Sequence, residues 1–384
     1  MVFSTTSAST EPVVTRAKLA GAALRILESP IKTAAAFVLV GRLLYSLIAA
    51  LYAPYLRLDS AFVNSNKLTY RLMSQSEGWK YSLLGVWERF DTLWYIHIAQ
   101  SGYDRPDALV FYPLYPLLIM ISHLPPLVAA LLISTVSSFL FAWGFQKLVM
   151  LDYLPAVGGR ALVLYLVWPA GFMLFAGYPE SLLLCCVVWA IYFARSGSAV
   201  GTVLMALLAG ATKPMGALVF VPIAFIAIRE SKWRVLASSL AAACAPVAMA
   251  LWLNASGRMA AQQVYATYWG TTIGPPWQTF WFALVVPTPF GGLNMLALCL
   301  VILFAFLGRL EYSFFAASVL WVVLSKQTMP LLESTSRYVM LIFPAFLNAG
   351  RVLDSRLRFA LFVAALALIA LSVLERFLNW RLIV

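Results

Sequence analysis

One aspartate, Asp91, stands in a polar and aromatic stretch between long apolar runs, WERFDTLWYIHIAQSGYDRPDALVFYPLYPLL, which begins at Trp87. On a helix, residues three, four and seven positions apart share a face, so Trp94, Tyr95 and Ile98 would lie beside its carboxylate. A carboxylate framed by aromatic rings can act as the general base for a hydroxyl group. It can equally cap a surface helix whose aromatic residues form an interfacial belt.

Two cations elsewhere in the chain would complement such a base. Lys213, in TKPMG, interrupts apolar sequence near the end of a predicted span, and Arg337 directly precedes YVMLIFPAF. A cation can stabilise a phosphate that leaves during group transfer. The alternative roles are snorkelling of Lys213 to the lipid headgroups and anchoring of a helix end by Arg337.

Further polar and aromatic residues extend the candidate site. Glu88, Asp104 and Asp107 are alternative bases on the same stretch. Glu180, in GYPES, is also placed to cap the helix that follows it. The residues expected to contact a sugar or an acceptor are Glu88, Trp94, Tyr95, Tyr103, Tyr178 and Glu180.

The histidines and cysteines do not predict a metal site. The two histidines stand apart, and the four cysteines all lie inside apolar runs, where they are typical packing residues. We therefore expect no bound metal and no cofactor, although a divalent ion held by loop carboxylates stays an alternative.

The composition is that of a protein embedded in a lipid bilayer. Of 384 residues, 62% are hydrophobic and 11% are charged, whereas soluble domains are nearer a quarter charged. The net charge of +12 comes from lysines and arginines scattered at the ends of apolar runs. This placement favours roles in membrane topology and in contacts with lipid phosphates over nucleic-acid binding.

Basic residues also predict the topology. Four of them precede the first apolar run, so the N-terminus is expected in the cytoplasm. Placing the later basic turns there as well gives about eleven crossings, with 111–121 as a re-entrant or interfacial segment. The polar turns at 177–180 and 211–214, the loop 254–292 and the segment 326–337 then face the same side as Asp91.

This scheme divides the chain into two parts. Residues 1–33 form a cytoplasmic interfacial lead-in, and residues 34–384 form a single all-α transmembrane domain. An outer loop at 54–124 carries Asp91, and a second outer loop covers 254–292.

Several of these motifs together resemble a known family. The run FDTLWYIHIAQSGY followed by FYPLYPLL resembles the first-loop motif of the PIG-V type mannosyltransferases, which have the GT-C fold. Further similar segments follow in the family's order: YPESLLL, ATKPMGALVFVP, QQVYATYWGTTIGPPW and SRYVMLIFPAF. They extend from Trp87 to Phe346. Two positions depart from the family pattern, since Phe90 replaces its tryptophan and Lys213 its arginine.

The resemblance implies a GT-C-like bundle and a reaction. A metal-independent, inverting enzyme would move a sugar, mannose in the family, from a polyprenyl-phosphate donor to a hydroxyl of a glycolipid or glycan. Asp91 would be the base, and Lys213 and Arg337 would bind the departing phosphate. A prokaryotic relative in the cell membrane is expected, with its active site on the outer face; the endoplasmic reticulum membrane, with a lumenal site, is the alternative.

Two other classes of function compete with this prediction. A lipid or solute transporter would place ionisable residues near the middle of several spans, whereas here they gather at span ends and in one outer loop. A non-catalytic subunit of a membrane complex is the second. The enzyme hypothesis requires Asp91, Lys213 and Arg337 to meet in one cavity beside a hydrophobic groove.

Overall fold

A computed structural model describes residues 26–58, 68, 72–285, 291–328, 332 and 334–381. Helices make up nearly all of the regular structure in these residues, and the one sheet among them has two short strands. The all-α class is therefore confirmed. Most of the predicted lead-in, residues 1–25, lies outside the described residues.

The elements follow one another from α2 to α20. The α-helices are α2 (Pro30–Tyr52), α4 (Trp79–Leu83), α5 (Asp91–Ser101), α6 (Leu114–Ile121), α7 (Pro126–Val149), α8 (Pro155–Val167), α9 (Glu180–Arg195), α10 (Ala199–Thr212), α11 (Phe220–Arg229), α12 (Trp233–Ser239), α13 (Ala241–Ala255), α14 (Ala261–Trp269), α15 (Pro276–Val285), α16 (Gly291–Ala305), α17 (Leu310–Ser325), α18 (Thr335–Tyr338), α19 (Phe343–Val352) and α20 (Arg356–Leu378). The 3-10 helices are η1 (Ala53–Tyr55), η3 (Gln75–Glu77), η4 (Gly85–Trp87), η5 (Pro106–Val110), η6 (Gly171–Leu174), η7 (Pro214–Val219) and η8 (Val339–Leu341). Strands β1 (Thr272–Ile273) and β2 (Lys326–Gln327) pair antiparallel.

Among the described residues, four helical segments are long and apolar enough to cross a membrane, which supports a membrane protein. They are Pro30–Tyr55, Pro126–Val149, Trp233–Ala255 and Arg356–Leu378. The prediction of about eleven crossings is not met by this criterion, because the remaining apolar runs form helices of 10–17 residues. A 14-residue helix such as α10 is only about 21 Å long, whereas the hydrocarbon core is about 30 Å thick.

Prolines border two of the shorter helices. Pro155 begins α8, and Pro214 begins η7 directly after α10. Proline suits the first turn of a helix but interrupts the turn before it, because it has no N–H and crowds the preceding residue. A single apolar run in the sequence is thereby divided into separate helices.

The predicted outer loop 54–124 is largely folded. It contains α4, α5, α6 and three 3-10 helices, with residues 59–67 and 69–71 outside the description. Helix α6 has eight residues, about 12 Å, so it is too short to span a bilayer. The prediction that 111–121 is not a full span is thus confirmed.

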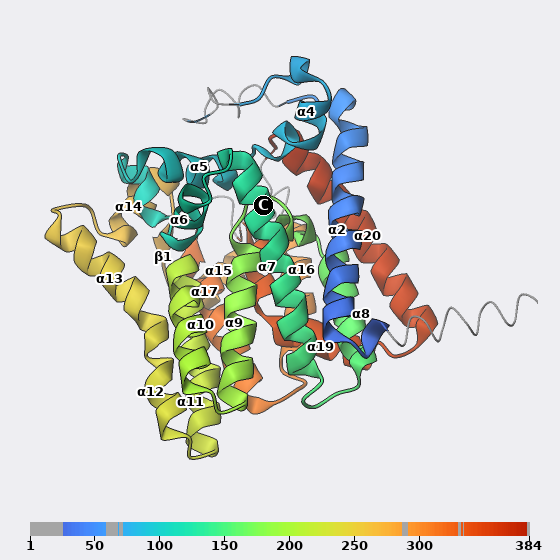
Figure 1. The fold of residues 1–384 in the computed structure, drawn as a ribbon, viewed down its shortest axis with the longest axis vertical. Helices are drawn as coiled ribbons and strands as arrows, with labels where there is room; N and C mark the ends of the chain where they lie inside the picture. The colour runs from blue at the N-terminus through green and yellow to red at the C-terminus, as the bar shows by residue number, and fades with distance from the viewer. Residues whose placement is uncertain are drawn as a thin grey trace, which may run out of the picture.

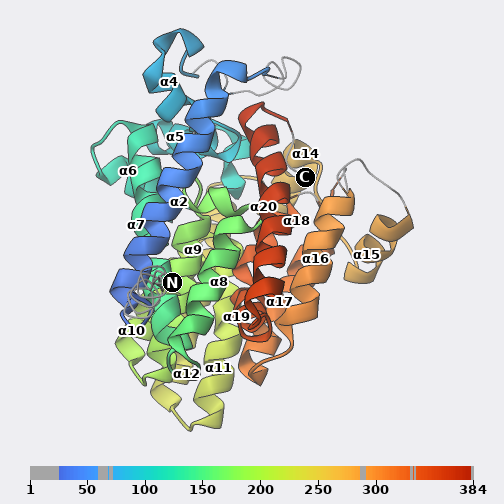
Figure 2. The ribbon, with the colours of Figure 1, turned by 90° about the vertical axis from the view of Figure 1, so that its right-hand side faces the viewer.

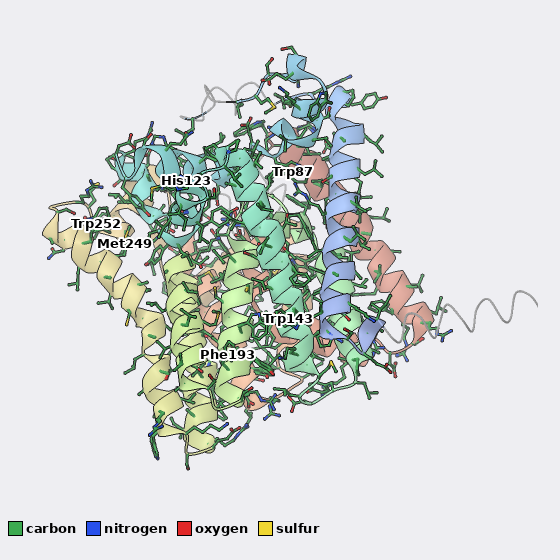
Figure 3. All side chains as sticks on the ribbon, viewed as in Figure 1. Trp87, His123, Trp143, Phe193, Met249 and Trp252 are labelled. Carbon is green, nitrogen blue, oxygen red and sulfur yellow. The ribbon has the colours of Figure 1, made fainter. Side chains whose placement is uncertain are left out.

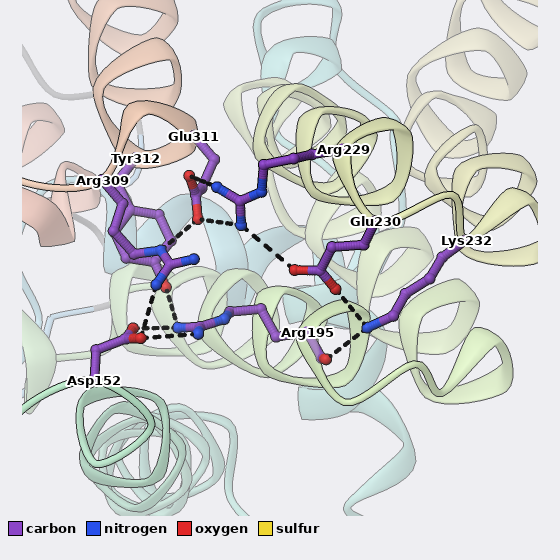
Figure 4. Close-up of polar contacts among 8 residues, drawn as sticks. All are labelled: Asp152, Arg195, Arg229, Glu230, Lys232, Arg309, Glu311 and Tyr312. Carbon is purple, nitrogen blue, oxygen red and sulfur yellow. Dashed lines mark hydrogen bonds and ion pairs between the residues drawn. The ribbon is translucent and has the colours of Figure 1, made fainter.

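The two ends of the helix bundle differ in what they carry. In both Figure 1 and Figure 2, α4, α5, α6 and α14 gather at one end, while α11 and α12 reach the other. Figure 3 places Trp87, His123 and Trp252 at the end with α5, and Phe193 toward the opposite end. We call the first the α5 end. We call the second the basic end, because Arg195, Arg229 and Arg309 lie there (Figure 4).

The basic end is held by a network of ion pairs (Figure 4). Asp152, between α7 and α8, pairs with Arg195 from α9 and with Arg309, whose Nη1 lies 2.7 Å from Oδ1. Glu311 is fully buried and accepts from Arg309 Nε at 2.5 Å and from Arg229 Nη1 at 3.1 Å. Basic turns that the sequence assigned to one side therefore do meet in space.

Candidate active site

Asp91 is the first residue of α5 and follows a sharp turn of the backbone. Phe90, just before it, has a φ of 49°, a left-handed conformation that is costly for a bulky residue. The Phe90 ring packs against Phe377 and Trp380 at centroid distances of 5.8 and 5.0 Å. The end of α20 thus supports the turn that presents Asp91.

The turn before α9 approaches α5 closely because it contains Gly177. A Cβ atom at Gly177 would lie 2.6 Å from Cγ2 of Thr92, too close for two carbon atoms. The next residue, Tyr178, is buried, and its hydroxyl oxygen accepts a hydrogen bond of 3.4 Å from the Asp91 backbone N–H. Burial raises the pKa of Tyr178 well above its ordinary value, so the phenol stays protonated.

Arg337 connects the two carboxylates of the site. Its Nη1 donates to Asp91 Oδ2 at 2.6 Å, and its Nε forms an ion pair with Glu180 Oε1 at 3.3 Å. The side chains of Arg337 and Asp91 are 11% and 20% exposed, so water screens their attraction weakly. Asp91 Oδ1 has no hydrogen-bond partner among the described residues, which leaves it available to a substrate hydroxyl.

Helix α8 holds Arg337 in place. Trp168, at the end of α8, donates from Nε1 to the carbonyl of Ser336 at 2.7 Å. The neighbouring Tyr165 stacks on Phe346 with ring centroids 3.9 Å apart. These contacts fix the short helix α18, which carries Arg337, against the bundle.

Lys213 pairs with Glu180 at the same place. Its Nζ lies 2.5 Å from Glu180 Oε1, and both side chains are largely buried. Glu180 is the first residue of α9, where the helix dipole favours a negative charge, as the sequence predicted. Glu180 therefore balances the charges of Lys213 and Arg337 from behind the site.

Three cations surround the ring of Tyr338, the last residue of α18. The Nζ atoms of Lys213 and Lys326 lie 5.7 and 5.1 Å from its ring centroid, and Arg337 Cζ lies 4.9 Å away. Burial opposes ionisation of the Tyr338 phenol, but the cations outweigh burial and lower its pKa to about 8. This corner of the site carries a positive potential that suits an anion.

These residues surround one cavity of about 620 Å³ at the α5 end. Asp91, Lys213 and Arg337 all line it, although Asp91 and Arg337 are 246 positions apart in the chain. The convergence that the enzyme hypothesis requires is therefore present. Tyr178 and Lys326 line the same cavity.

Aromatic rings form one wall of the cavity. Trp94 stacks on Phe111 at 5.6 Å with an angle of 14° between the rings, and Trp269 packs edge-on to both. Tyr95 lines the cavity beside them and is almost fully buried. Flat aromatic faces of this kind can pack against the apolar face of a sugar ring and exclude water.

An apolar surface continues the cavity toward the outside. Trp321 and Ile273 line the cavity and are also 60% and 67% exposed. Helix α15 packs next to α17 and exposes Trp277 and Trp281. These exposed apolar side chains lie where the enzyme hypothesis expects a hydrophobic groove beside the polar residues.

Three predicted contact residues lie outside the cavity lining. One is Glu180, which lies behind the site, and the others are Glu88 and Tyr103. Glu88 accepts a hydrogen bond of 2.6 Å from the Met73 backbone N–H, and burial raises its pKa above the ordinary value. The Tyr103 hydroxyl donates to the carbonyl of Phe111 at 2.7 Å, and its ring packs on Trp252. Both support the first loop, and the structure does not bring them to Asp91.

The alternative bases are also engaged elsewhere. Asp104 Oδ1 lies 2.7 Å from His97 Nε2, and Asp107 pairs with Arg105 at 3.1 Å. Neither acid lines the cavity. Among the acids of the first loop that the structure describes, Asp91 alone faces it.

Several cavity residues were not predicted individually. Lys326, Tyr338, Tyr265 and Trp269 line the cavity, yet the sequence pointed only to the segments that contain them. Lys326 gave no separate signal because a lysine at the end of an apolar helix usually marks a membrane boundary.

Among the described residues, no group of three or more histidine, cysteine, aspartate or glutamate side chains is arranged to hold a metal ion. No protein-family model matches the chain, and a search of curated proteins finds no match. The resemblance to the PIG-V type mannosyltransferases rests on the motifs alone.

Proposed function

We propose that the chain is a membrane glycosyltransferase that moves a sugar, mannose in the first instance, from a polyprenyl-phosphate donor to a hydroxyl of a glycolipid or glycan. The observation that carries this proposal is the meeting of Asp91, Arg337 and Lys213 in one cavity with an apolar exit. Such a cavity has a base, cations for a phosphate and a surface for an isoprenoid chain.

The reaction follows from the arrangement of charges. Asp91 Oδ1 takes the proton of the acceptor hydroxyl while that oxygen attacks the anomeric carbon of the donor sugar. The bond from the anomeric carbon to the phosphate oxygen breaks, and the polyprenyl phosphate leaves with the bonding electron pair. Attack from the face opposite the leaving group inverts the configuration of the sugar. The cations at Tyr338 stabilise the negative charge that grows on the phosphate.

Arg337 has two functions in this scheme. Its bond to Asp91 Oδ2 holds the carboxylate in place and orients Oδ1 toward the cavity. Its position beside Tyr338 brings the same guanidinium near the proposed phosphate. The aromatic wall of Trp94 and Phe111 would face the sugar, and the exposed surface around Trp321 would face the lipid tail.

The α5 end is proposed to face the outer or lumenal side of the membrane. Positive residues favour the cytoplasmic side, and the arginines of the ion-pair network lie at the opposite end. The lipid bilayer, a polyprenyl-phosphate sugar and a glycolipid or glycan acceptor are thus the proposed partners.

Asp91→Asn tests the assignment of the base. The variant keeps the side-chain volume but cannot accept a proton, so we expect transfer from a purified polyprenyl-phosphate sugar to fall by about 10²-fold or more. Asp104→Asn, on the same loop but outside the cavity, is the matched control and should retain activity. Near-normal turnover by the Asp91 variant would refute the proposed role.

The same assay separates transfer from transport. The wild-type protein, reconstituted in vesicles with a panel of polyprenyl-phosphate sugars, should yield a new glycosidic product and free polyprenyl phosphate. Movement of intact donor or sugar across the vesicle membrane without cleavage would instead favour a transporter.

A further inference from the structure

The cations of the cavity differ in how their charges are compensated. Arg337 pairs with Asp91 and Glu180, and Lys213 pairs with Glu180. Lys326 also lines the cavity, but it has no carboxylate partner among the residues that the structure describes. None of the described carboxylates therefore neutralises the charge of Lys326 before an anion enters.

The backbone around Lys326 is fixed. Lys326 pairs with Ile273 in the β1–β2 ribbon, and the Gly274 N–H donates to the carbonyl of Ser325 at 2.9 Å. Its ammonium lies over the face of Tyr338, 5.1 Å from the ring centroid. This contact with an aromatic face leaves ammonium N–H groups free to donate to a ligand.

Tyr338 supplies a second donor at the same place. Its hydroxyl oxygen accepts a hydrogen bond from Arg337 Nη2 at 3.1 Å. A hydroxyl that accepts in this way still has its own proton to donate. An ammonium and a phenolic O–H thus lie together on the cavity wall.

We propose that Lys326 and Tyr338 form the first binding point for the phosphate of an isoprenyl phosphate headgroup. The identity of the donor rests on the proposed function, but the pair is assigned from its own geometry. Lys213, already bound to Glu180, also lies over Tyr338 and adds its charge as the phosphate leaves. The isoprenoid chain would leave the pair along the exposed side of α17 at Trp321.

A binding measurement without turnover tests this pair. We would titrate farnesyl phosphate, farnesol and inorganic phosphate into the purified wild-type protein and its variants by calorimetry. Lys326→Gln should weaken farnesyl phosphate binding at least tenfold, and Lys326→Arg should restore most of it because it keeps the charge. Tyr338→Phe should cost about threefold, the scale of one hydrogen bond. Lys80→Gln, an exposed lysine at the same end but outside the cavity, should bind as the wild type does.

The results separate this proposal from the proposed function. Wild-type affinity in both the Lys326→Gln and Tyr338→Phe variants would overturn the assignment, and so would equal binding of inorganic and farnesyl phosphate. If Lys326→Gln does not give monodisperse protein, Tyr338→Phe decides alone, and wild-type affinity for farnesyl phosphate in that variant would reject the pair. If the pair binds farnesyl phosphate but no donor loses its sugar, the binding site stands and the transferase function fails.

Discussion

The phenol of Tyr338 is expected to make binding of the proposed donor sensitive to pH. Lys326, Arg337 and Lys213 face it, with Asp91 also close enough to act on it electrostatically, and together they set its pKa to about 8. Below that pH the protonated phenol can donate to a phosphate oxygen. Above it, the phenolate has no proton to donate and repels the phosphate.

We therefore expect kcat/KM for the donor to fall as the pH rises through about 8. The donor phosphate is a diester with no second proton to lose, so its own charge is constant in this range. Tyr338→Phe should have a lower kcat/KM at neutral pH and lack the decline near pH 8. The same decline in that variant would show that another group titrates.

Asp91 could be selected from the sequence, and Lys326 could not. The spacing of aromatics around Asp91 is local information, and the first turn of α5 preserves it. The proposed role of Lys326 depends on which other cations pair with carboxylates. Those pairs join residues far apart in the chain, such as Arg337 and Asp91, which are 246 positions apart. No pattern within one segment contains this information.

At the scale of elements, the site depends on how closely short helices approach one another. The turn before α9 reaches α5 only because Gly177 has no side chain. Gly177→Ala should push Thr92 and the start of α5 away, with an overpacking cost of about 1–3 kcal/mol. We expect a lower melting temperature and at least tenfold slower transfer.

A second change tests the cause of that defect. Thr92→Ser removes the Cγ2 atom that a Cβ at position 177 would meet, so the double variant should recover much of the loss. Additive defects in the double variant would exclude this contact as the cause.

The number of crossings was the weakest part of the sequence prediction at this scale. Hydrophobicity alone does not distinguish a helix that spans the bilayer from a shorter helix that packs inside the bundle. Both α7 and α10 read as apolar runs, but α10 has 14 residues and α7 has 24. Pro214 marks the break after α10, whereas the helix lengths followed only from tertiary packing.

At the scale of the whole molecule, the separation of the α5 end from the basic end predicts an orientation. Lys80→Cys places a thiol at the first end and Arg234→Cys at the second, each in a background where Cys244 and Cys299, which are exposed, are replaced by serine. A membrane-impermeant maleimide should label Lys80→Cys in intact cells and Arg234→Cys only after permeabilisation. The reverse pattern would invert the proposed topology.

The two-stranded ribbon has a thermodynamic consequence. It joins Lys326 to Ile273 through the backbone, so the proposed phosphate-binding cation and the predicted second outer loop belong to one small unit. If a headgroup binds there, any interaction that orders this unit would favour its binding. By linkage, binding would then favour the ordered unit by the same free energy. We therefore expect donor binding and ordering of the loop that carries Trp269 and Ile273 to be reciprocal.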